Sequence, residues 1–358
     1  MDDPRQRRRV VALSGTGAAA LVIGGSGQAL IGRSTPPTLT LPEPARPLPA
    51  LPKGVDVGKS GISPFVTANA DFYRIDTALL APRVDPGDWS LTIDGDVPDG
   101  FSVDIDELLA MPMVERDITL NCVSNEVGGP YIGHARWLGV PTRELLARAG
   151  LDTDPRDPDL QVLSTSTDGM TISTPLSALL DGRDALVAVG MNGAPLPREH
   201  GFPARLVTPG LYGFVGATKW LTRMTVTRYD AASAYWTDRD WATDGRVRTQ
   251  ARIDTPRALR RIPPGRTVIG GVAWAQRRGI ERVEVRVDDG EWRRATLGTE
   301  AGVDCWRQWF LPWDATPGRH DLTVRATDGD GELQTQQEAT PFPAGATGWH
   351  SVAVTVTD

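Results

Sequence analysis

From about Val247 to the end, the chain carries the pattern that most limits its fold, because apolar and polar side chains alternate in short runs. Residues 283–287, 322–326 and 352–356 each place an apolar side chain at every second position. Successive side chains of a strand point to opposite faces, so this alternation predicts strands with one buried face. Asp289-Gly290 and residues 328–331 supply turn signals. With no convincing helix, residues 247–358 are predicted to form an all-β sandwich.

Residues 54–246 show a different pattern, in which β-prone and helical segments interleave irregularly. Strands are predicted near residues 89–93, 160–165, 186–189, 205–208 and 220–227, and helices near 102–109 and 140–150. Pro141 in a first turn and Gly150 at the end are typical of a helix. The irregular order predicts an α+β class. A length of 358 residues suits two domains and a tail.

The first 53 residues are predicted to lie outside the folded domains. Arg7, Arg8 and Arg9 precede an uncharged run from Val10 to Ile31, which is about as long as a membrane span requires. We therefore predict an export signal or membrane anchor over residues 1–33, with the folded domains extracytoplasmic. A disordered Gly/Ala-rich leader is the alternative. The many prolines of residues 34–53 predict a stiff linker that cannot join a core.

Composition excludes several classes of site. The net charge of -7 gives no reason to expect a nucleic acid as partner. Cys122 and Cys305 are the two cysteines, and the sequence has no CxxC, CxxCH or HExxH motif. A cysteine-built zinc site, a c-type haem and a redox dithiol are therefore not supported.

The stretch DITLNCVSNEVGG, residues 117–129, places Cys122 where a β-prone run meets a polar turn. A thiolate is a soft ligand, but one cysteine alone cannot hold a bare metal ion. Cys122 would therefore complete a site whose other ligands come from an organic cofactor. The alternatives are a small buried apolar residue and a disulfide with Cys305.

A second stretch, PREHGFPARLVTPGLYGFVGATKWLTR at residues 197–223, combines His200, Arg205 and Lys219 with several glycines. Glycines let the backbone approach a ligand closely. Arginine and lysine can hold a phosphate, and a histidine can donate to one. The stretch matches neither a Walker loop nor GxGxxG. It predicts an anion-binding cradle, and the alternative is a loop with ordinary surface charges.

Together these stretches resemble the sulfite oxidase family of molybdopterin enzymes. That family has a strand ending in a metal-ligating cysteine, then a segment close to LPRDHGFPxRxVxPG, then KWL. The chain has LNC at 120–122, LPREHGFPAR at 196–205 and KWL at 219–221. Downstream, GGVAW, VEV with DGEW, WRQW and WHSV follow the order of the family's dimerisation domain. The resemblance runs from about Pro64 to the end. It implies a molybdopterin-binding catalytic domain over 54–246 and an immunoglobulin-like dimerisation domain over 247–358.

The resemblance also implies roles for individual residues. Cys122 would ligate molybdenum beside the dithiolene of one molybdopterin. The implied cofactor-binding residues are Asn69, Asp71, Phe72, Tyr73, Asp168, His200, Arg205, Gly216, Ala217, Thr218 and Lys219. The implied catalytic residues are Cys122, Glu126, Trp241 and Arg307. Trp241 stands where the family has an active-site tyrosine, and Arg307 is expected to reach toward the pocket.

The chain departs from sulfite oxidases around the cysteine. Their turn continues Ala-Gly-Asn-Arg-Arg, whereas residues 123–127 read VSNEV, and a second family arginine aligns with Ser90. Losing these cations weakens binding of a doubly charged anion. We therefore expect sulfite to be a poor substrate. The pocket is similar to that of the bacterial exported branch, some members of which reduce sulfoxides.

The implied function is two-electron oxygen-atom transfer on a small sulfur or nitrogen compound, with molybdenum-molybdopterin as cofactor. Because the sequence carries no haem or flavin motif, a separate cytochrome or quinone-linked protein is expected to exchange the electrons. The β-domain implies a homodimer, and the N-terminal segment implies contact with a membrane. Two alternatives stay open: an exported non-catalytic binding protein on the same scaffold, and a hydrolase that pairs Cys122 with His134 or His200.

Overall fold

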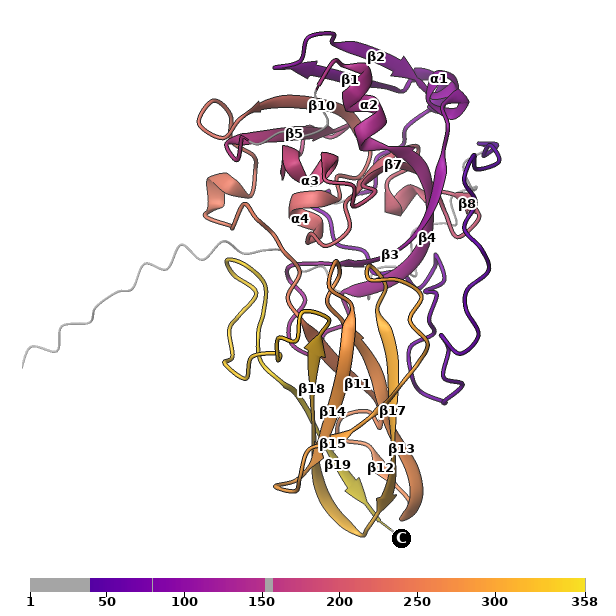
Figure 1. Cartoon of the computed structure of the whole chain (residues 1–358), viewed down its shortest axis with the longest axis vertical. Helices are drawn as coiled ribbons and strands as arrows, with labels where there is room; N and C mark the ends of the chain where they lie inside the picture. Colours follow the sequence, from indigo (N-terminus) through magenta and orange to yellow (C-terminus); the bar gives the residue numbers. More distant parts are fainter. Residues whose placement is uncertain (1–38, 79, 152–156, 358) are drawn as a thin grey trace, which may run out of the picture. The chain divides into compact units, whose positions relative to one another are not determined.

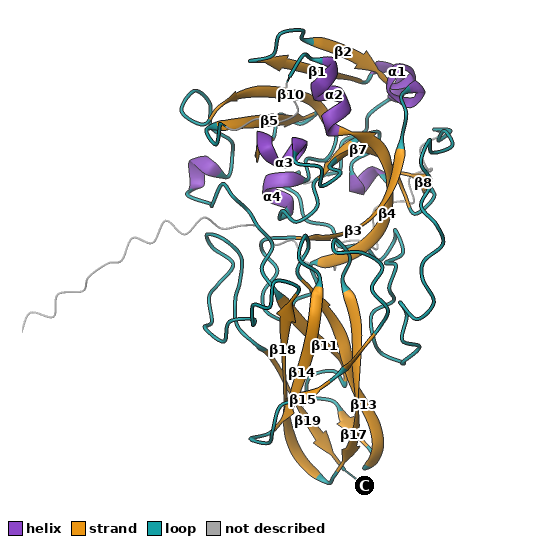
Figure 2. Ribbon diagram, viewed as in Figure 1, coloured by secondary structure: helices purple, strands orange, loops and turns teal. Residues whose placement is uncertain are grey.

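The computed structural model describes residues 39–78, 80–151 and 157–357. Strands and loops predominate in this part of the chain, and the helices are few and short (Figures 1 and 2). The α+β prediction is therefore correct only in part, because the described chain is mostly β. The predicted export signal or anchor, residues 1–33, lies outside the described residues. No described helix combines the length and the apolar composition needed to cross a bilayer.

Two sheets lie before residue 250. The first has the order β2-β1-β10-β5-β6, with β1 and β10 parallel and the other pairs antiparallel. The second has the antiparallel order β3-β4-β7-β8, and β9 pairs with β7. The strands are β1 (Ser90–Gly95), β2 (Phe101–Asp104), β3 (Val114–Asn121), β4 (Ile132–Pro141), β5 (Leu160–Ser166), β6 (Thr171–Pro175), β7 (Leu186–Met191), β8 (Ala194–Pro195), β9 (Arg205–Val207) and β10 (Leu221–Arg228).

The helices occupy short segments between these strands. They are α1 (Ile105–Ala110), α2 (Thr142–Arg148), α3 (Leu176–Leu180) and α4 (Gly213–Gly216), with 3-10 turns η1 (Pro86–Asp88), η2 (Arg198–His200) and η3 (Thr237–Arg239). Helix α1 begins at a reciprocal cap, in which Asp104 accepts from the Glu107 N–H and Glu107 accepts from the Asp104 N–H. The helix predicted over 102–109 therefore starts later than expected, since residues 101–104 belong to β2. The helix predicted from Val140 starts at Thr142, where β4 ends.

After residue 250 the described chain contains strands and loops alone, as predicted. One sheet has the order β11-β13-β17-β16 and the other β12-β19-β18-β14-β15. Their strands are β11 (Gln250–Thr255), β12 (Arg261–Ile262), β13 (Gly265–Trp274), β14 (Ile280–Val287), β15 (Arg293–Arg294), β16 (Thr296–Leu297), β17 (Arg307–Ala315), β18 (Gly318–Asp328) and β19 (His350–Val356). Apolar side chains from both sheets share one core, which includes Ile269, Trp309, Val285 and Val324. We call this pair of sheets the β-sandwich (orange and yellow in Figure 1).

The described part of the proline-rich segment, residues 39–53, packs against the folded chain. Leu39 and Leu41 contact the core of the first domain. The Ala45 N–H donates to the Met113 carbonyl (2.8 Å), and Arg46 bridges to Val114 at the start of β3. The expectation that this segment could not join a core is therefore wrong. Prolines remove backbone donors, but the leucines between them still bury apolar surface.

Candidate functional site

Cys122 lies directly after β3, on a turn that hydrogen bonds hold at several points. The Cys122 N–H donates to the Tyr131 carbonyl (3.0 Å), and the Asn125 N–H donates to the Cys122 carbonyl (3.1 Å). The Asn125 side chain accepts from the Tyr131 N–H (2.8 Å). A Cβ on Gly129 would lie 2.6 Å from this Asn125 oxygen, which explains a glycine there. Cys122 is 9% exposed, and burial raises the pKa of its thiol.

The two cysteines of the chain are both free and buried. A disulfide between Cys122 and Cys305, which the sequence left open, is therefore absent. The Cys305 thiol instead donates to the Asp117 carbonyl (3.4 Å). Burial raises the pKa of Cys305, and the charge of Asp117 adds to the effect. An inert buried thiol of this kind is a structural residue.

Arg205, the first residue of β9, is a buried cation without an anionic partner. Its guanidinium donates to the carbonyls of His200 (3.1 Å), Ala217 (3.3 Å) and Leu206 (3.4 Å). Arg205 is 5% exposed, and no carboxylate of the described residues forms an ion pair with it. Burial lowers its pKa to about 10. Such a charge is costly to bury alone, so the arrangement favours a bound anion beside it.

Lys219 supplies a second cation close to Arg205, but this cation is paired. Its Nζ lies 2.7 Å from Asp76 Oδ2 and 3.3 Å from the Glu199 carbonyl. Burial lowers the pKa of Lys219 to about 8, although Asp76 opposes the shift. Burial alone would raise the pKa of Asp76, but Lys219 and Arg74 hold it below its usual range. Asp76 was not among the predicted site residues, because its partner Lys219 lies far away along the chain.

The segment from Asn69 to Tyr73 contacts His200. Asn69 offers its carbonyl to His200 Nε2 (3.0 Å), and the Phe72 ring lies edge-on to His200 with centroids 5.6 Å apart. Burial raises the pKa of Tyr73, and the charges of Cys122 and Arg205 also act on it. Tyr73 is therefore close to both the thiol and the buried cation. The structure thus brings together six predicted site residues from three separate stretches: Asn69, Phe72, Tyr73, Cys122, His200 and Arg205.

Residues 216–219 pack tightly against the same cation. A Cβ on Gly216 would lie 2.8 Å from Thr208 Cβ. The Ala217 carbonyl accepts from Arg205, and the Thr218 hydroxyl shares a hydrogen bond with Ser164 (2.6 Å). Three buried side-chain oxygens around this segment have no hydrogen-bond partner in the described chain: Asn121 Oδ1, Ser166 Oγ and Thr208 Oγ1. Buried polar atoms normally find partners, so these fit a polar group bound here.

Four other predicted site residues are not buried with this group, although Asp71 belongs to the Asn69–Tyr73 segment and Glu126 to the cysteine turn. Glu126, Asp71 and Asp168 are exposed, and Asp168 accepts from the Met170 N–H (3.2 Å) within its own turn. Arg307 donates to the carbonyls of Gly298 and Ile280, within the β-sandwich, and lies 3.5 Å from Glu300. These contacts do not support the expectation that Arg307 reaches toward the pocket.

Trp241 is half-buried in an aromatic group. Its ring packs on Phe214, Trp236 and Phe342, with centroids 5.3–5.8 Å apart. Phe214 belongs to α4, and the neighbouring Gly213 approaches the Asn121 carbonyl. The aromatic group therefore begins beside the strand end that carries Cys122.

Tyr212 is a buried residue of the site that the sequence analysis did not single out. Its hydroxyl accepts from the Arg248 N–H (3.2 Å). Burial raises its pKa to about 12, and the charge of Cys122 contributes. Tyr212 lies between two glycines of the glycine-rich stretch. That position was the feature of the sequence that could have identified it as a site residue.

His134 is fully buried. Its Nδ1 lies 3.0 Å from the Thr119 hydroxyl, and its ring stacks on Trp306 and lies tilted against Phe65. Burial lowers its pKa to about 4, although Asp117 opposes the shift. Burial also lowers the pKa of His200 to about 3. Both imidazoles are therefore neutral at neutral pH, and neither is hydrogen bonded to Cys122 in the described chain.

Acidification from about pH 7 to about pH 4.5 is expected to lower the free energy of unfolding by roughly 2–3 kcal/mol through His134 alone. The pKa is about 4 in the folded chain and 6.5 when exposed. The unfolded chain therefore binds a proton that the folded chain refuses, so stability falls below about pH 6.5 and the effect levels off below about pH 4. Denaturant titrations at both pH values measure it.

The matched pair for this measurement is His134→Gln and His320→Gln. Asp288 holds the pKa of His320 above its usual range, so His320 stabilises the fold in acid. His134→Gln should flatten the pH dependence, and His320→Gln should not. An unchanged slope in His134→Gln would contradict the assignment.

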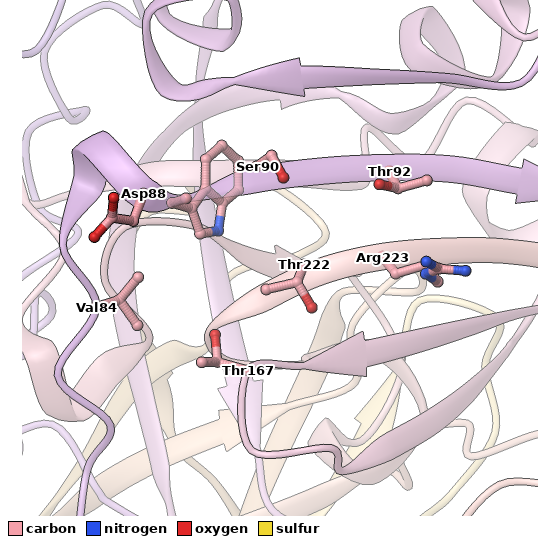
Figure 3. Close-up of a pocket in the computed structure, with 8 residues that line it drawn as sticks. Val84, Asp88, Ser90, Thr92, Thr167, Thr222 and Arg223 are labelled. Atoms are coloured by element: carbon pink, nitrogen blue, oxygen red, sulfur yellow. The ribbon is translucent and has the colours of Figure 1, made fainter.

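Two of the cavities on the described surface lie outside this group of residues. One of about 290 Å³ lies beside β1 and β10, and its lining includes Ser90, Thr92, Thr167, Thr222 and Arg223 (Figure 3). The other, of about 530 Å³, lies beside the cysteine turn and is lined by Asp71, Gly128, Arg252, Arg257 and others. Ser90, where the family has an arginine, thus faces the first cavity.

Comparison with known proteins decides the family. Residues 78–236 match the family described as oxidoreductase molybdopterin binding domain. Human mitochondrial sulfite oxidase is 31% identical over 314 residues, which cover 73% of this chain and 55% of that protein. The chain belongs to the sulfite oxidase family. Its domain over 78–236 is accordingly a molybdopterin-binding domain, with molybdenum-molybdopterin as the cofactor.

Two further similar proteins extend the comparison. The protein-methionine-sulfoxide reductase catalytic subunit of Burkholderia mallei is 28% identical over 229 residues, covering 59% of this chain and 66% of that protein. The sulfane dehydrogenase SoxCD of Paracoccus pantotrophus shares the fold, with a TM-score of 0.69 at 23% identity, over 83% of this chain and 85% of that chain. The chain spans about half the length of the mammalian sulfite oxidases it matches, 55% for the human protein.

Proposed function

We propose that the chain is a molybdenum oxidoreductase that transfers an oxygen atom to or from a small sulfur or nitrogen compound. Cys122 would ligate the metal. Arg205 and Lys219 would hold the pterin phosphate, and Tyr73 with residues 216–219 would line the pterin. The cofactor, when bound, supplies the metal centre at which two electrons and an oxygen atom are exchanged. The chain supplies the thiolate, the orientation and the electrostatics.

The buried guanidinium of Arg205 is the observation that carries this proposal. It donates to carbonyls alone and has no carboxylate partner among the described residues. A phosphate at this position would neutralise it and accept charge-assisted hydrogen bonds. Tyr73 lies close to both Arg205 and Cys122, so one cofactor could contact all three. The unpartnered oxygens of Ser166 and Thr208 would find partners on the same cofactor.

His200 has a narrower role than a phosphate donor in this arrangement. Its Nε2 donates to the Asn69 carbonyl (3.0 Å), and burial and Arg205 keep the ring neutral. Its Nδ1 is then an acceptor. We propose that His200 fixes the Asn69–Tyr73 segment against the cofactor, and that Arg205 and Lys219 provide the charge for the phosphate.

The substrate is proposed to carry less negative charge than sulfite. By the resemblance, Glu126 and Val127 stand where sulfite oxidases have arginines on the turn. Arg252 does reach the turn, but its donors are engaged by the Gly129 carbonyl (2.9 Å), Ser63 (2.9 Å) and Asp254 (2.6 Å). It therefore has little left to offer a dianion. A neutral or singly charged sulfur or nitrogen oxide fits this environment better.

The hydrolase alternative finds no support in the site. A cysteine nucleophile needs a base within hydrogen-bond reach. His134 bonds to Thr119 and His200 to Asn69. Burial lowers the pKa of both rings and raises the pKa of Cys122, which disfavours a thiolate–imidazolium pair.

The finer assignments of the chain are proposals of the same kind. We propose a leader over 1–33, a proline-rich segment over 34–53 whose described part packs on the folded chain, a catalytic domain over 54–246 and an immunoglobulin-like dimerisation domain over 247–358. The protein would be exported, form a homodimer and exchange electrons with a separate cytochrome or quinone-linked protein. Asp71, Asp168, Glu126, Trp241 and Arg307 remain predicted site residues.

Metal and pterin analysis tests the proposed function. Protein purified from a host supplied with molybdate should contain about one molybdenum atom and one pterin per chain, because one cysteine serves one metal centre. Turnover of sulfite should be less efficient than turnover of an uncharged sulfoxide by the same preparation. Protein free of both metal and pterin would refute the proposal and favour a non-catalytic binding protein. Sulfite as the better substrate would contradict the charge argument alone.

A further inference from the structure

The outer edge of β3 is covered at Thr119 by the loops that follow β13 and precede β17 of the β-sandwich, whereas Arg46 bridges to its start. β3 is the last strand of its sheet, and Cys122 follows it directly. An edge strand leaves every second residue with an unpaired N–H and C=O. Figure 1 shows β3 beside the ends of the orange strands of the β-sandwich. The Thr119 N–H donates to the Asp304 carbonyl (2.9 Å), and Gln276 Nε2 donates to the Thr119 carbonyl (3.0 Å).

The Thr119 side chain is also fully engaged. Its hydroxyl oxygen accepts from the Trp306 N–H (2.8 Å). Its one proton is thus available for His134 Nδ1, 3.0 Å away on the neighbouring strand β4. Thr119, His134, Gln276 and Trp306 are each 3% exposed or less. All four hydrogen-bonding positions of one residue are therefore used, and three of the partners come from the β-sandwich.

We propose that Thr119 is a positioning residue that fixes the direction of the Cys122 sulfur by joining its strand to the β-sandwich. Thr119 precedes Cys122 by three residues, about 10 Å along a strand. The turn that follows β3 is hydrogen bonded to the backbone of Cys122. A shift of β3 at Thr119 therefore moves the Cys122 sulfur as well. The role of the sulfur as a metal ligand rests on the proposed function, whereas the joint between strand and β-sandwich does not.

The substitution Thr119→Val tests this joint, because valine keeps the shape and removes the hydroxyl. It leaves the Trp306 N–H and His134 Nδ1 without a partner in a buried place. Thr119→Ser keeps the hydroxyl and should behave as the parent. Gln276→Met removes the donor to the Thr119 carbonyl and leaves Thr119 itself in place. Thr142→Val is the matched control, since Thr142 is buried and donates to the Leu179 carbonyl (2.8 Å) on α3, away from Cys122.

Two measurements report on the direction of the sulfur. In the loaded enzyme, the electron paramagnetic resonance spectrum of the half-reduced metal should shift or broaden in Thr119→Val and Gln276→Met. kcat should fall roughly tenfold with KM little changed, since one buried hydrogen bond is lost. In full-length protein from a cofactor-deficient host, with Cys305→Ser as background, a small thiol reagent should label Cys122 roughly tenfold faster in the same two variants.

Thr119→Ser and Thr142→Val should match the parent in both measurements. Parent-like spectra and labelling rates in Thr119→Val and Gln276→Met would overturn the proposal. If Thr119→Val does not fold, Gln276→Met and Thr119→Ser decide it. A parent protein that takes up no molybdenum refutes the proposed function, and the labelling rates still decide the role of Thr119.

Discussion

Replacement of Cys122 by serine is expected to lower turnover at least about 1,000-fold while the protein stays folded and keeps its pterin. Removing an outer-shell partner of a metal already costs roughly 10- to 100-fold, and a ligand should cost more. The groups proposed to hold the phosphate, Arg205 and Lys219, are untouched by the change. Serine is also close to cysteine in size, so the buried turn should persist. Turnover, pterin content and circular dichroism of the same sample measure the loss of activity, the retained pterin and the retained fold.

The control is the other buried cysteine. Cys305→Ser keeps a donor for the Asp117 carbonyl, the acceptor of the Cys305 thiol. It should retain both turnover and metal, because Cys305 is proposed to be structural. Equal losses in both variants would point to damaged folding and not to ligation. Turnover that survives in Cys122→Ser would remove Cys122 from the metal site.

Arg205→Met is expected to weaken cofactor binding without lowering the melting temperature of the cofactor-free protein. Removing one member of a buried, hydrogen-bonded charge pair costs about 2–5 kcal/mol, which is a loss of affinity of roughly 30- to 5,000-fold. Protein purified without added cofactor, however, holds this cation with no carboxylate beside it. An apolar side chain of similar volume is often tolerated there or is stabilising. Methionine should thus leave the melting temperature of cofactor-free protein unchanged or raised.

Arg223→Met is the matched control for this experiment. Arg223 is an arginine of the same domain, but its side chain is 53% exposed and pairs with Asp94 (2.8 Å). Its loss should alter neither cofactor content nor the melting temperature by much. Full molybdenum and pterin in Arg205→Met would show that the anion is bound elsewhere.

The sequence was most informative where the residues of the site lie close together along the chain. The Cys122 turn and the Arg205–Lys219 stretch could be located because each keeps its chemistry within a few dozen residues. The strands of the β-sandwich were predicted because one buried face gives strict alternation, as in β19. β4 was missed for the opposite reason. It is buried on both faces, so its residues show no alternation, and Val140 was taken as the start of a helix.

Contacts between distant segments could not be predicted from periodicity. Asp76 neutralises Lys219 from the other end of the domain, and Asp304 accepts from Thr119 across the chain. Leu39 and Leu41 pack on a core, although the prolines around them predicted a segment that could not join one. In each case the pairing depends on tertiary proximity, which a single sequence does not encode in any local pattern.

The covered edge of β3 also bears on how the chain could be divided. A fragment ending near residue 246 would retain every residue proposed to hold the cofactor. It would also uncover a strand whose N–H and C=O groups at Thr119 now bond to Asp304 and Gln276. Uncovered edges pair readily with strands of other molecules. The boundary near residue 247 therefore separates two architectures but not two independently soluble parts, and a catalytic fragment would need a new cover for β3 before it could be handled alone.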